Sequence, residues 1–336
     1  MEYRSLGHSG LKVSPLCLGT MMFGDRTEET VAQRIVDKGL DFGVNFIDTA
    51  DVYSFGASEE MTGRTISEHR NHWVLATKVA NPMGQGPNQR GLSRQWIMKA
   101  CEDSLRRLKS DHIDIYYLHK EDHSTPLLET VNAIGDLQKS GKIRYFGVSN
   151  HRSWRVAEIC NLCDGLGIDR PIVSQPYYNA INRMPETEHI PACDYYGLGI
   201  AAYSPVARGV LTGKYIPGQD PSENTRAGRN DRRIMQTEWR EESLIIAQTV
   251  KAHAELYGMS PVQFATLWVL NNAMVTSAIA GPRTEEQWDD YLGIFDQKFS
   301  KEDEALIDRL VAEGHSSTPG YNDPAYPLEG RIALTD

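Results

Sequence analysis

Four side chains that can hold or transfer a proton follow apolar segments typical of buried strands. The stretch VNFIDTADVY presents Asp48 and then Tyr53, WVLATK ends in Lys78, and IDIYYLH ends in His119. A phenol has an ordinary pKa near ~10, so at neutral pH it can donate a proton, and a neighbouring ammonium group lowers that pKa. Asp48 beside Lys78 would keep the lysine charged, and His119 would orient a carbonyl oxygen against the phenol.

Together these four groups could polarise a carbonyl and deliver a proton as negative charge develops on its oxygen. That half-reaction needs a hydride donor, which no side chain supplies, and a nicotinamide cofactor is therefore implied. A strand-end lysine such as Lys78 also suits a lyase that forms a Schiff base. The acidic neighbour Asp48 disfavours that alternative, because it keeps the amine protonated and non-nucleophilic.

The elements that must position these groups alternate along the whole chain. The expected strands are Pro15–Gly19, Val44–Asp48, Trp73–Lys78, Ile113–His119, Ile143–Ser149, Ile172–Gln175, Gly199–Ser204 and Thr276–Gly281. The expected helices are Thr27–Phe42, Ser58–Ser67, Ser93–Lys109, Pro126–Ser140, Ser153–Leu166, Pro185–Tyr196, Glu241–Tyr257, Pro261–Asn271, Thr284–Ile294 and Lys301–Glu313. Ser93 and Ser153 are the expected caps of their helices.

Eight strand–helix alternations predict a single α/β domain over residues 1–336, closed as a parallel (β/α)8 TIM barrel. In such barrels chemistry gathers at the carboxyl ends of the strands, which is where the four groups lie. The alternative is a doubly wound sheet, which should carry G-x-G-x-x-G after its first strand. The stretch after Leu18 is GTMMFG, with a different glycine spacing, and this favours the barrel.

The bulk composition limits the class of protein. The 336 residues include 35 Lys and Arg against 45 Asp and Glu, which gives a formal net charge of −10. This balance argues against a general binder of nucleic acid or anionic membrane. The opening MEYRSLGHSG lacks the pattern of a secretory signal, and no apolar run approaches the ~20 residues of a membrane span. We therefore expect a cytoplasmic protein that acts on small molecules.

The five cysteines are an odd number and are scattered through predicted helices and strands. Cys160 and Cys163 are spaced like half of a zinc site, but no second Cys or His pair stands at a matching interval. We expect reduced cysteines and no metal site.

The sequence resembles the aldo-keto reductases along essentially its whole length. The matching stretches are YRSLGHSGLKVSPLCLGTMMFG, NFIDTADVY, VLATKV, YYLH, IRYFGVSN, SQPYYN, AAYSPVARGVLTGKY and AIAGPRTEEQ. The opening and the chain length are closer to the bacterial and potassium-channel-beta-subunit branch than to the shorter aldose-reductase branch. The resemblance implies a (β/α)8 barrel with a short N-terminal β-hairpin at its bottom and extra C-terminal helices.

The resemblance also implies roles for individual residues. Tyr53 would be the general acid, and Asp48, Lys78 and His119 its partners. The nicotinamide would contact Gly19, Thr20, Met21, Ser149, Asn150, Gln175 and Tyr203. The pyrophosphate and ribose would contact Ser204, Pro205, Val206, Ala207, Gly209 and Lys214. The adenosine end would lie near Gly281, Arg283, Gln287 and Asp290.

The guanidinium of Arg283 can bind a ribose 2′-phosphate bidentately, which favours NADP(H), with NAD(H) as the alternative cofactor. The alternative interpretation of Arg283 is a solvated arginine at a helix start. Asp290-Tyr291 stands where relatives commonly carry Glu-Asn, so the resemblance does not settle which residues contact the adenine. The stretch Lys120–His123 also departs from the family pattern, as a polar rim or as solvated loop charges.

A carbonyl or alcohol substrate would contact Met22, Phe23, Tyr53, Phe55, Asn81 and His119. The Gly-, Asn- and Arg-rich excursion Ala207–Arg240 and the tail near Tyr321–Tyr326 could close over it. Besides a reductase, the resemblance permits a sensor or regulatory subunit that keeps NADP(H) but turns over slowly.

Overall fold

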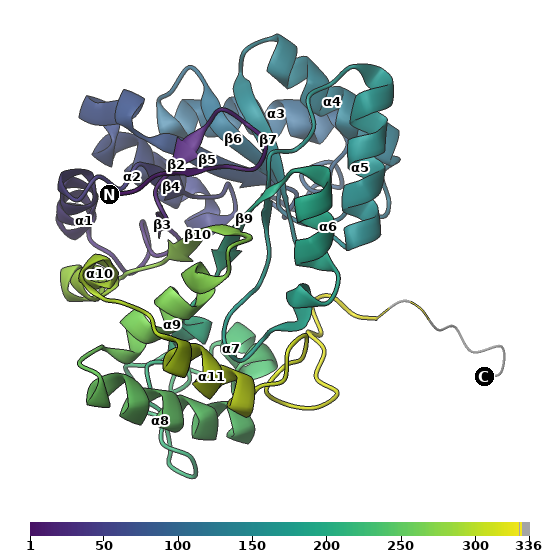
Figure 1. The fold of residues 1–336 in the computed structure, drawn as a ribbon. Helices are drawn as coiled ribbons and strands as arrows, with labels where there is room; N and C mark the ends of the chain where they lie inside the picture. Colours follow the sequence, from purple (N-terminus) through teal and green to yellow (C-terminus); the bar gives the residue numbers. More distant parts are fainter. Residues whose placement is uncertain (329, 331–336) are drawn as a thin grey trace.

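The computed structural model of the protein describes residues 1–328 and residue 330. Eight parallel strands close into one barrel, and helices surround it (Figure 1). The strands are β3 (Leu16–Gly19), β4 (Phe46–Asp48), β5 (Val74–Val79), β6 (Ile113–Leu118), β7 (Ile143–Ser149), β8 (Val173–Gln175), β9 (Gly199–Tyr203) and β10 (Val275–Ala280). The prediction of a (β/α)8 barrel is confirmed, and positions 329 and 331–336 of the predicted domain lie outside the described residues.

The register of the strands brings the predicted acid–base groups to one end of the barrel. Asp48 is the Cα partner of Ala76, and Lys78 follows two residues later on the same strand. Side chains two residues apart on a strand point to the same face, so Asp48 and Lys78 both point into the barrel. Gly19 is the Cα partner of Asp48 on the other side, and a Cβ at this position would lie 2.9 Å from Cγ2 of Ile279.

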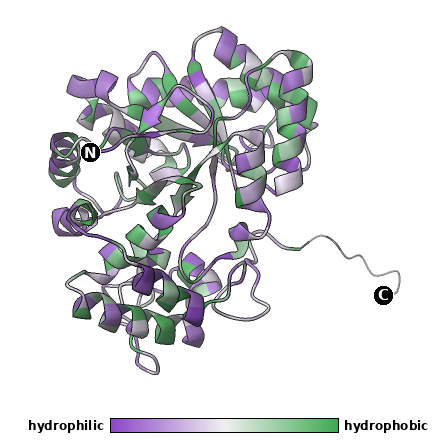
Figure 2. Cartoon of the chain, viewed as in Figure 1, coloured by the Kyte–Doolittle hydropathy of each residue, from purple (hydrophilic) through white to green (hydrophobic). Residues whose placement is uncertain are grey.

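Two layers of apolar side chains form the core. The inner layer fills the barrel with Leu6, Val13, Phe46, Ile115 and Tyr117 and their neighbours, all fully buried. The outer and larger layer lies between the strands and the helices. Hydrophobic and hydrophilic residues alternate along the helices, as expected when one face of each helix packs on the barrel (Figure 2).

The antiparallel hairpin of β1 (Arg4–Ser5) and β2 (Lys12–Val13) covers the amino ends of the strands. Arg4 donates from its guanidinium to the carbonyl of Val275 at 2.8 Å, at the start of β10. Leu6 and Val13 of this hairpin insert into the inner core. The bottom of the barrel is therefore closed by the chain itself, and the carboxyl ends of the strands remain for a ligand.

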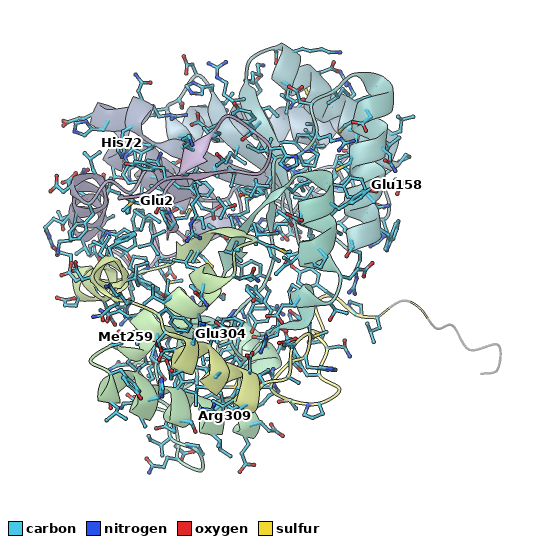
Figure 3. All side chains as sticks on the ribbon, viewed as in Figure 1. Glu2, His72, Glu158, Met259, Glu304 and Arg309 are labelled. Atoms are coloured by element: carbon cyan, nitrogen blue, oxygen red, sulfur yellow. The ribbon has the colours of Figure 1, made fainter. Side chains whose placement is uncertain are left out.

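The helices follow the predicted order with ends that differ by a few residues. They are α1 (Glu29–Asp41), α2 (Ala57–Thr65), α3 (Arg94–Leu108), α4 (Leu127–Lys139), α5 (Ser153–Leu166), α6 (His189–Tyr196), α7 (Arg232–Thr237), α8 (Glu241–Leu256), α9 (Pro261–Asn271), α10 (Glu285–Leu292) and α11 (Lys301–Leu310). Glu158 of α5 and Arg309 of α11 project outward into solvent (Figure 3).

Three details differ from the predicted helices. The side chain of Ser93 caps α3 as predicted, but Ser153 is the first residue of α5 and makes no cap. The helix predicted from Pro185 begins only at His189, because the preceding Met184–Glu186 forms a separate 3-10 turn. The excursion Ala207–Arg240 contains the short helix α7, which was not predicted; the Asp231 carboxylate caps its start by accepting from the amides of the second and third helical residues.

No helix among the described residues is long and apolar enough to cross a membrane. The five cysteines are free and buried, and Cys160 and Cys163 both lie inside α5. Among the residues that the structure describes, no group of three His, Cys, Asp or Glu side chains is placed to hold a metal ion.

Two helical glycines give a matched test of the helix packing. A Cβ on Gly63 of α2 would lie 2.4 Å from the carbonyl oxygen of Leu108, whereas a Cβ on Gly165 of α5 meets nothing within 4 Å. Gly63→Ala should therefore lower the free energy of unfolding by about 1–3 kcal/mol, because α2 must move away from Leu108 at the end of α3. Gly165→Ala should raise it by about 0.5–1 kcal/mol. Urea denaturation checks both, and equal midpoints for Gly63→Ala and the parent protein would contradict the packing.

Candidate active site

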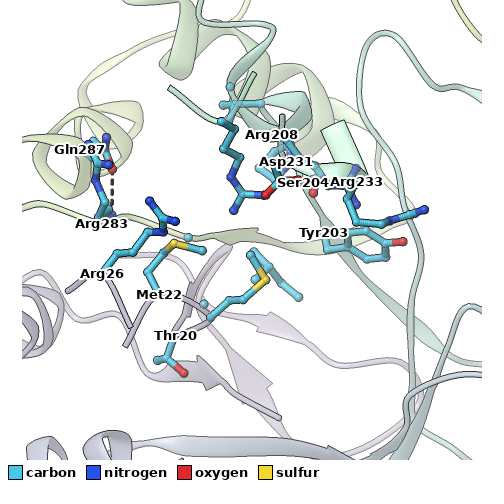
Figure 4. Close-up of a pocket in the computed structure, with 18 of the residues that line it drawn as sticks. Thr20, Met22, Arg26, Tyr203, Ser204, Arg208, Asp231, Arg233, Arg283 and Gln287 are labelled. Atoms are coloured by element: carbon cyan, nitrogen blue, oxygen red, sulfur yellow. Dashed lines mark hydrogen bonds and ion pairs between the residues drawn. The ribbon is translucent and has the colours of Figure 1, made fainter. Parts of the chain in front are cut away.

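A cavity of about 540 Å³ opens at the carboxyl ends of the barrel strands (Figure 4). The predicted cofactor and catalytic residues that line it are Gly19, Thr20, Met21, Asp48, Tyr53, His119, Ser149, Asn150, Gln175, Tyr203, Ser204, Pro205, Val206, Gly209, Lys214, Gly281, Arg283, Gln287 and Asp290. They come from strand ends, from the loops that follow them and from helix α10, and the barrel brings them to one surface.

Lys78 is the central group at the base of this cavity. Its ammonium donates to the Asp48 carboxylate at 2.5 Å, to the carbonyl of Thr49 at 2.7 Å and to the Tyr53 oxygen at 3.2 Å. The lysine is fully buried, and Gln175 donates to the second Asp48 oxygen at 3.0 Å. Since the Tyr53 oxygen accepts from Lys78, its own O–H is left to donate to a molecule in the cavity.

The environment sets the protonation states of this cluster. Burial alone would lower the pKa of Lys78, but the Asp48 charge and the contact with Tyr53 hold it above its usual value. Burial raises the pKa of Tyr53 more than Lys78 lowers it, so the net shift is upward and differs from the predicted direction. The phenol is consequently protonated throughout the neutral range, which is the state of a proton donor.

His119 completes the acid–base group. Its ring lies edge-on to Tyr53, with 6.0 Å between the ring centres. Burial and then the Lys78 charge depress its pKa well below 6.5, so the imidazole is neutral. The Asn81 amide nitrogen lies 3.1 Å from Nδ1. With Asn81 donating to Nδ1, the ring carries its proton on Nε2, where it can donate to an oxygen beside Tyr53.

A second polar network follows the ends of β7, β8 and β9. Ser149 donates to the carbonyl of Gln175 at 2.9 Å, and Tyr203 donates to the Asn150 side-chain oxygen at 2.9 Å. Asn150 in turn donates to the carbonyl of His119 at 3.0 Å. These bonds fix the amide and hydroxyl groups at one wall of the cavity, beside the tyrosine ring.

The backbone beyond β9 is held in an unusual conformation. Ser204, Ala207 and Arg208 have φ angles of 58°, 50° and 50°, in the left-handed region that non-glycine residues disfavour. Such positions cost on the order of 1–3 kcal/mol each and cluster at functional sites. A Cβ on Gly209 would lie 2.9 Å from the Lys214 ammonium, so glycine leaves the space that this lysine occupies.

Positive charge gathers around Lys214. Burial lowers the pKa of Lys214, and the neighbouring charges of Arg226, Arg283 and Arg229 lower it further. All four side chains line the cavity. Mutual repulsion of this kind is relieved when a ligand with several negative charges binds among them. The cavity therefore fits a phosphate-bearing cofactor, with hydrogen-bonding groups at one wall and cations at another.

The excursion Ala207–Arg240 and the tail near Tyr321–Tyr326 were expected to close over the site, but several individual lining residues were not predicted. They are Asp25, Arg26, Arg208, Thr212, Asn224, Thr225, Arg226, Arg229, Asp231, Arg233, Val262, Ile279, Tyr291 and Tyr326. Many belong to the excursion Ala207–Arg240. Its high arginine content is visible in the sequence, but the sequence does not show which of these arginines face the cavity. Figure 4 shows Arg26 from the loop after β3 on the same side as Arg283, and Arg208 across the cavity from them.

Five predicted residues do not line the cavity. Phe23 and Ala207 are fully buried, and the Phe55 side chain is 80% exposed. Asn81 lies behind His119, and Lys78 lies beneath Asp48 and Tyr53. Of the predicted substrate contacts, the cavity surface therefore presents Met22, Tyr53 and His119.

Comparison with known proteins agrees with this geometry. A model of the aldo/keto reductase family matches residues 15–312. The chain belongs to the aldo/keto reductase family. An Arabidopsis thaliana protein named as a probable voltage-gated potassium channel subunit beta is 38% identical over 292 residues, covering 85% of this chain and 89% of the relative. An uncharacterised oxidoreductase of Bacillus subtilis, YrpG, is 34% identical over 330 residues, covering 95% and 98%.

A third relative is the L-glyceraldehyde 3-phosphate reductase of Escherichia coli K12, 31% identical over 325 residues, which cover 94% of this chain and 93% of the relative. This aldo/keto reductase is accordingly an oxidoreductase. The matched region includes the four acid–base groups and the cation cluster, whereas Tyr326, which lines the cavity, lies beyond it.

His151 lies directly behind the Asn150 wall of this aldo/keto reductase and is nearly fully buried. Its Nδ1 donates to the carbonyl of Ser149 at 2.8 Å. Burial lowers the pKa of His151 to about 4, so the neutral ring is the folded form. The pKa of His151 in the folded protein is below the ordinary value of ~6.5 for an unfolded chain. The folded protein therefore keeps its full stability above pH ~6.5 and loses stability as the pH falls toward 4.

We predict a pH-dependent effect of His151→Gln. The shift of the His151 pKa corresponds to about 3 kcal/mol, so the stability advantage of the parent protein over the variant should shrink by that amount between pH 7.5 and 4. Urea unfolding at several pH values measures the difference. A difference that stays constant over this range would show that His151 is not buried in its neutral form.

Proposed function

We propose that this protein is an NADP(H)-dependent reductase of aldehydes or ketones, or catalyses the reverse oxidation, with Tyr53 as general acid. The observation that carries the proposal is the fully buried Lys78, which bridges Asp48 and the Tyr53 oxygen at the base of a cavity whose wall is rich in cations. We propose one catalytic domain for the whole chain and a cytoplasmic location, which the five free cysteines support.

Each acid–base group has a distinct task in this proposal. The Tyr53 O–H donates to the substrate oxygen, and the Nε2–H of His119 donates to the same oxygen from the side. Lys78 stabilises the phenolate that forms when the proton leaves, because its ammonium is 3.2 Å from the Tyr53 oxygen. Asp48 holds that ammonium in place. The nicotinamide, when bound, supplies or accepts the hydride.

The remaining walls would hold the cofactor. Ser149, Asn150 and Gln175 supply the amide and hydroxyl groups that a carboxamide requires, and the Tyr203 ring offers a flat face for stacking. Lys214 with Arg226 supplies charge for a pyrophosphate. Their mutual repulsion in the free protein is evidence that this wall is built for an anion.

Arg283 would bind the 2′-phosphate that distinguishes NADP(H) from NAD(H). Its backbone amide donates to the Gln287 side chain at 2.8 Å, which fixes the residue at the start of α10. Among the described residues the Arg283 guanidinium makes no hydrogen bond or ion pair, and the residue lines the cavity. The donors of this guanidinium can therefore pair bidentately with a phosphate.

Tyr53→Phe tests the general acid. The variant should bind NADPH normally but lose about 10²–10⁴-fold in the turnover number for carbonyl reduction, because the proton donor is removed. The loss of NADPH absorbance with a panel of aldehydes, together with cofactor titration by fluorescence, provides both measurements. Retention of more than half of the turnover would remove Tyr53 from the acid role.

Arg283→Ala tests the cofactor. It should weaken NADPH binding by roughly tenfold or more, since a charge-assisted pair is worth about 1.5–3 kcal/mol, while NADH binding changes little. The matched control is Arg34→Ala: Arg34 pairs with Glu285 near the same helix start but does not line the cavity. An unchanged ratio of the two cofactor affinities in Arg283→Ala would refute the assignment.

A second candidate is an NADP(H)-binding sensor or regulatory subunit with slow turnover. The relative named as a probable channel beta subunit favours it, with 38% identity over most of this chain. Stopped-flow mixing of the NADPH-loaded protein with aldehydes separates the two. Oxidation of the bound cofactor within seconds supports the reductase, and no loss of absorbance with any carbonyl supports the sensor.

A further inference from the structure

Tyr53 stands on a turn whose backbone would not hold its shape unaided. Ser54, Phe55 and Gly56 follow it with φ angles of 49°, 51° and 95°, three consecutive residues in the left-handed region. Two of the three carry a Cβ, for which this region costs on the order of 1–2 kcal/mol each. The surroundings must therefore impose the conformation that places the phenol beside Lys78.

One side chain lies directly against this turn. A Cβ on Gly56 would be 2.7 Å from Cδ and 2.9 Å from Nε of Arg107, so the arginine stem of α3 packs on the bare backbone of Gly56. The same Nε donates to the Glu59 carboxylate of α2 at 2.6 Å. The Arg107 side chain is 15% exposed and that of Glu59 is 0% exposed, so this ion pair is largely shielded from water.

The other oxygen of Glu59 reaches the strand that carries the lysine. Thr77 donates from its hydroxyl to this oxygen at 2.5 Å. Successive residues of a strand face opposite sides, so Thr77 points to the helix layer while Lys78, the next residue, points into the barrel. One buried carboxylate thus joins the turn that bears Tyr53, through Arg107, to the strand β5 that bears Lys78.

A third ionisable group, Asp51, lies near the ion pair of Arg107 and Glu59. Asp51 is buried close by, and burial and then the Glu59 charge raise its pKa well above its ordinary value. A second negative charge beside Glu59 is therefore disfavoured, and Arg107 forms its ion pair with Glu59. Asp51 lies in the turn that follows β4 and is fully buried.

We propose that Glu59 and Arg107 are positioning residues that hold the Tyr53 oxygen at hydrogen-bond distance from Lys78. The inference rests on the proposed function in one respect, since positioning matters for turnover only if Tyr53 is the acid. Neither side chain lines the cavity, and both act through the turn and the strand.

The test replaces the pair as a unit. Arg107→Leu alone would leave a buried unpaired carboxylate and could unfold the protein, whereas Glu59→Met with Arg107→Leu substitutes apolar groups of similar size, an exchange that folded proteins often tolerate. The matched control is Arg106→Leu: Arg106 is adjacent on α3, is 70% exposed and pairs with Asp103 on the surface. Arg107→Lys serves as the conservative variant.

Three measurements are made on each folded variant: steady-state kinetics with an aldehyde, which give kcat and KM, the Kd for NADPH, and amide hydrogen exchange of residues 53–57. The double variant should lose at least tenfold in kcat, and up to the order of 10²-fold, with KM and Kd within twofold and faster exchange in this segment. Arg107→Lys should recover part of the kcat, and Arg106→Leu should match the parent in all three.

A folded double variant with kcat within twofold of the parent overturns the proposal, whether or not exchange changes. A parent protein that reduces no carbonyl refutes the proposed function separately. In that case the exchange of residues 53–57 in the double variant still decides whether the ion pair holds the turn, and unchanged exchange overturns the proposal.

Discussion

The structure depends on one buried ion pair, Lys78 with Asp48. Removing two charges from water costs several kcal/mol for each ion, and their attraction offsets this only when the remaining hydrogen-bonding positions are filled. Here Thr49, Gln175 and the Tyr53 oxygen fill them. The register of β4 with β5 must therefore be correct to one residue, because a slip would turn either charge into the helix layer.

Two features around the mouth of the barrel lower the stability of the folded protein. Left-handed backbone occurs beside Tyr53, at Asn150, and in the loop after β9, all next to groups that line the cavity. Positive charges repel one another around Lys214. Both features are unfavourable in the free protein, and the charge repulsion would be relieved by the anionic cofactor that we propose. A closed barrel with two apolar layers can tolerate them, because its stability comes from elsewhere in the fold.

The sequence predicted the barrel, which is confirmed, and placed candidate acid–base groups at its strand ends, because both signals are local. An apolar run followed by Asp48 or Lys78 is visible in a few residues, and strand ends in such a barrel converge by geometry. It did not predict the short helix α7 or the positions of Arg208, Arg226 and Arg229, because these depend on how a long loop folds back over the cavity. Phe23 and Phe55 were expected to contact the substrate, but neither lines the cavity, although the nearby Met22 and Tyr53 do. The local backbone directs Phe23 into the core and Phe55 into solvent.

The central claim is that the buried ammonium of Lys78 makes Tyr53 an effective acid. Single-turnover stopped flow of the NADPH-loaded double variant Lys78→Met with Asp48→Asn tests it most directly, since methionine is unbranched and uncharged and asparagine avoids leaving a buried unpaired carboxylate. We expect the variant to retain bound NADPH but to oxidise it at least 10²-fold more slowly than the parent protein. A variant that binds NADPH and oxidises it at the parent rate would contradict the account.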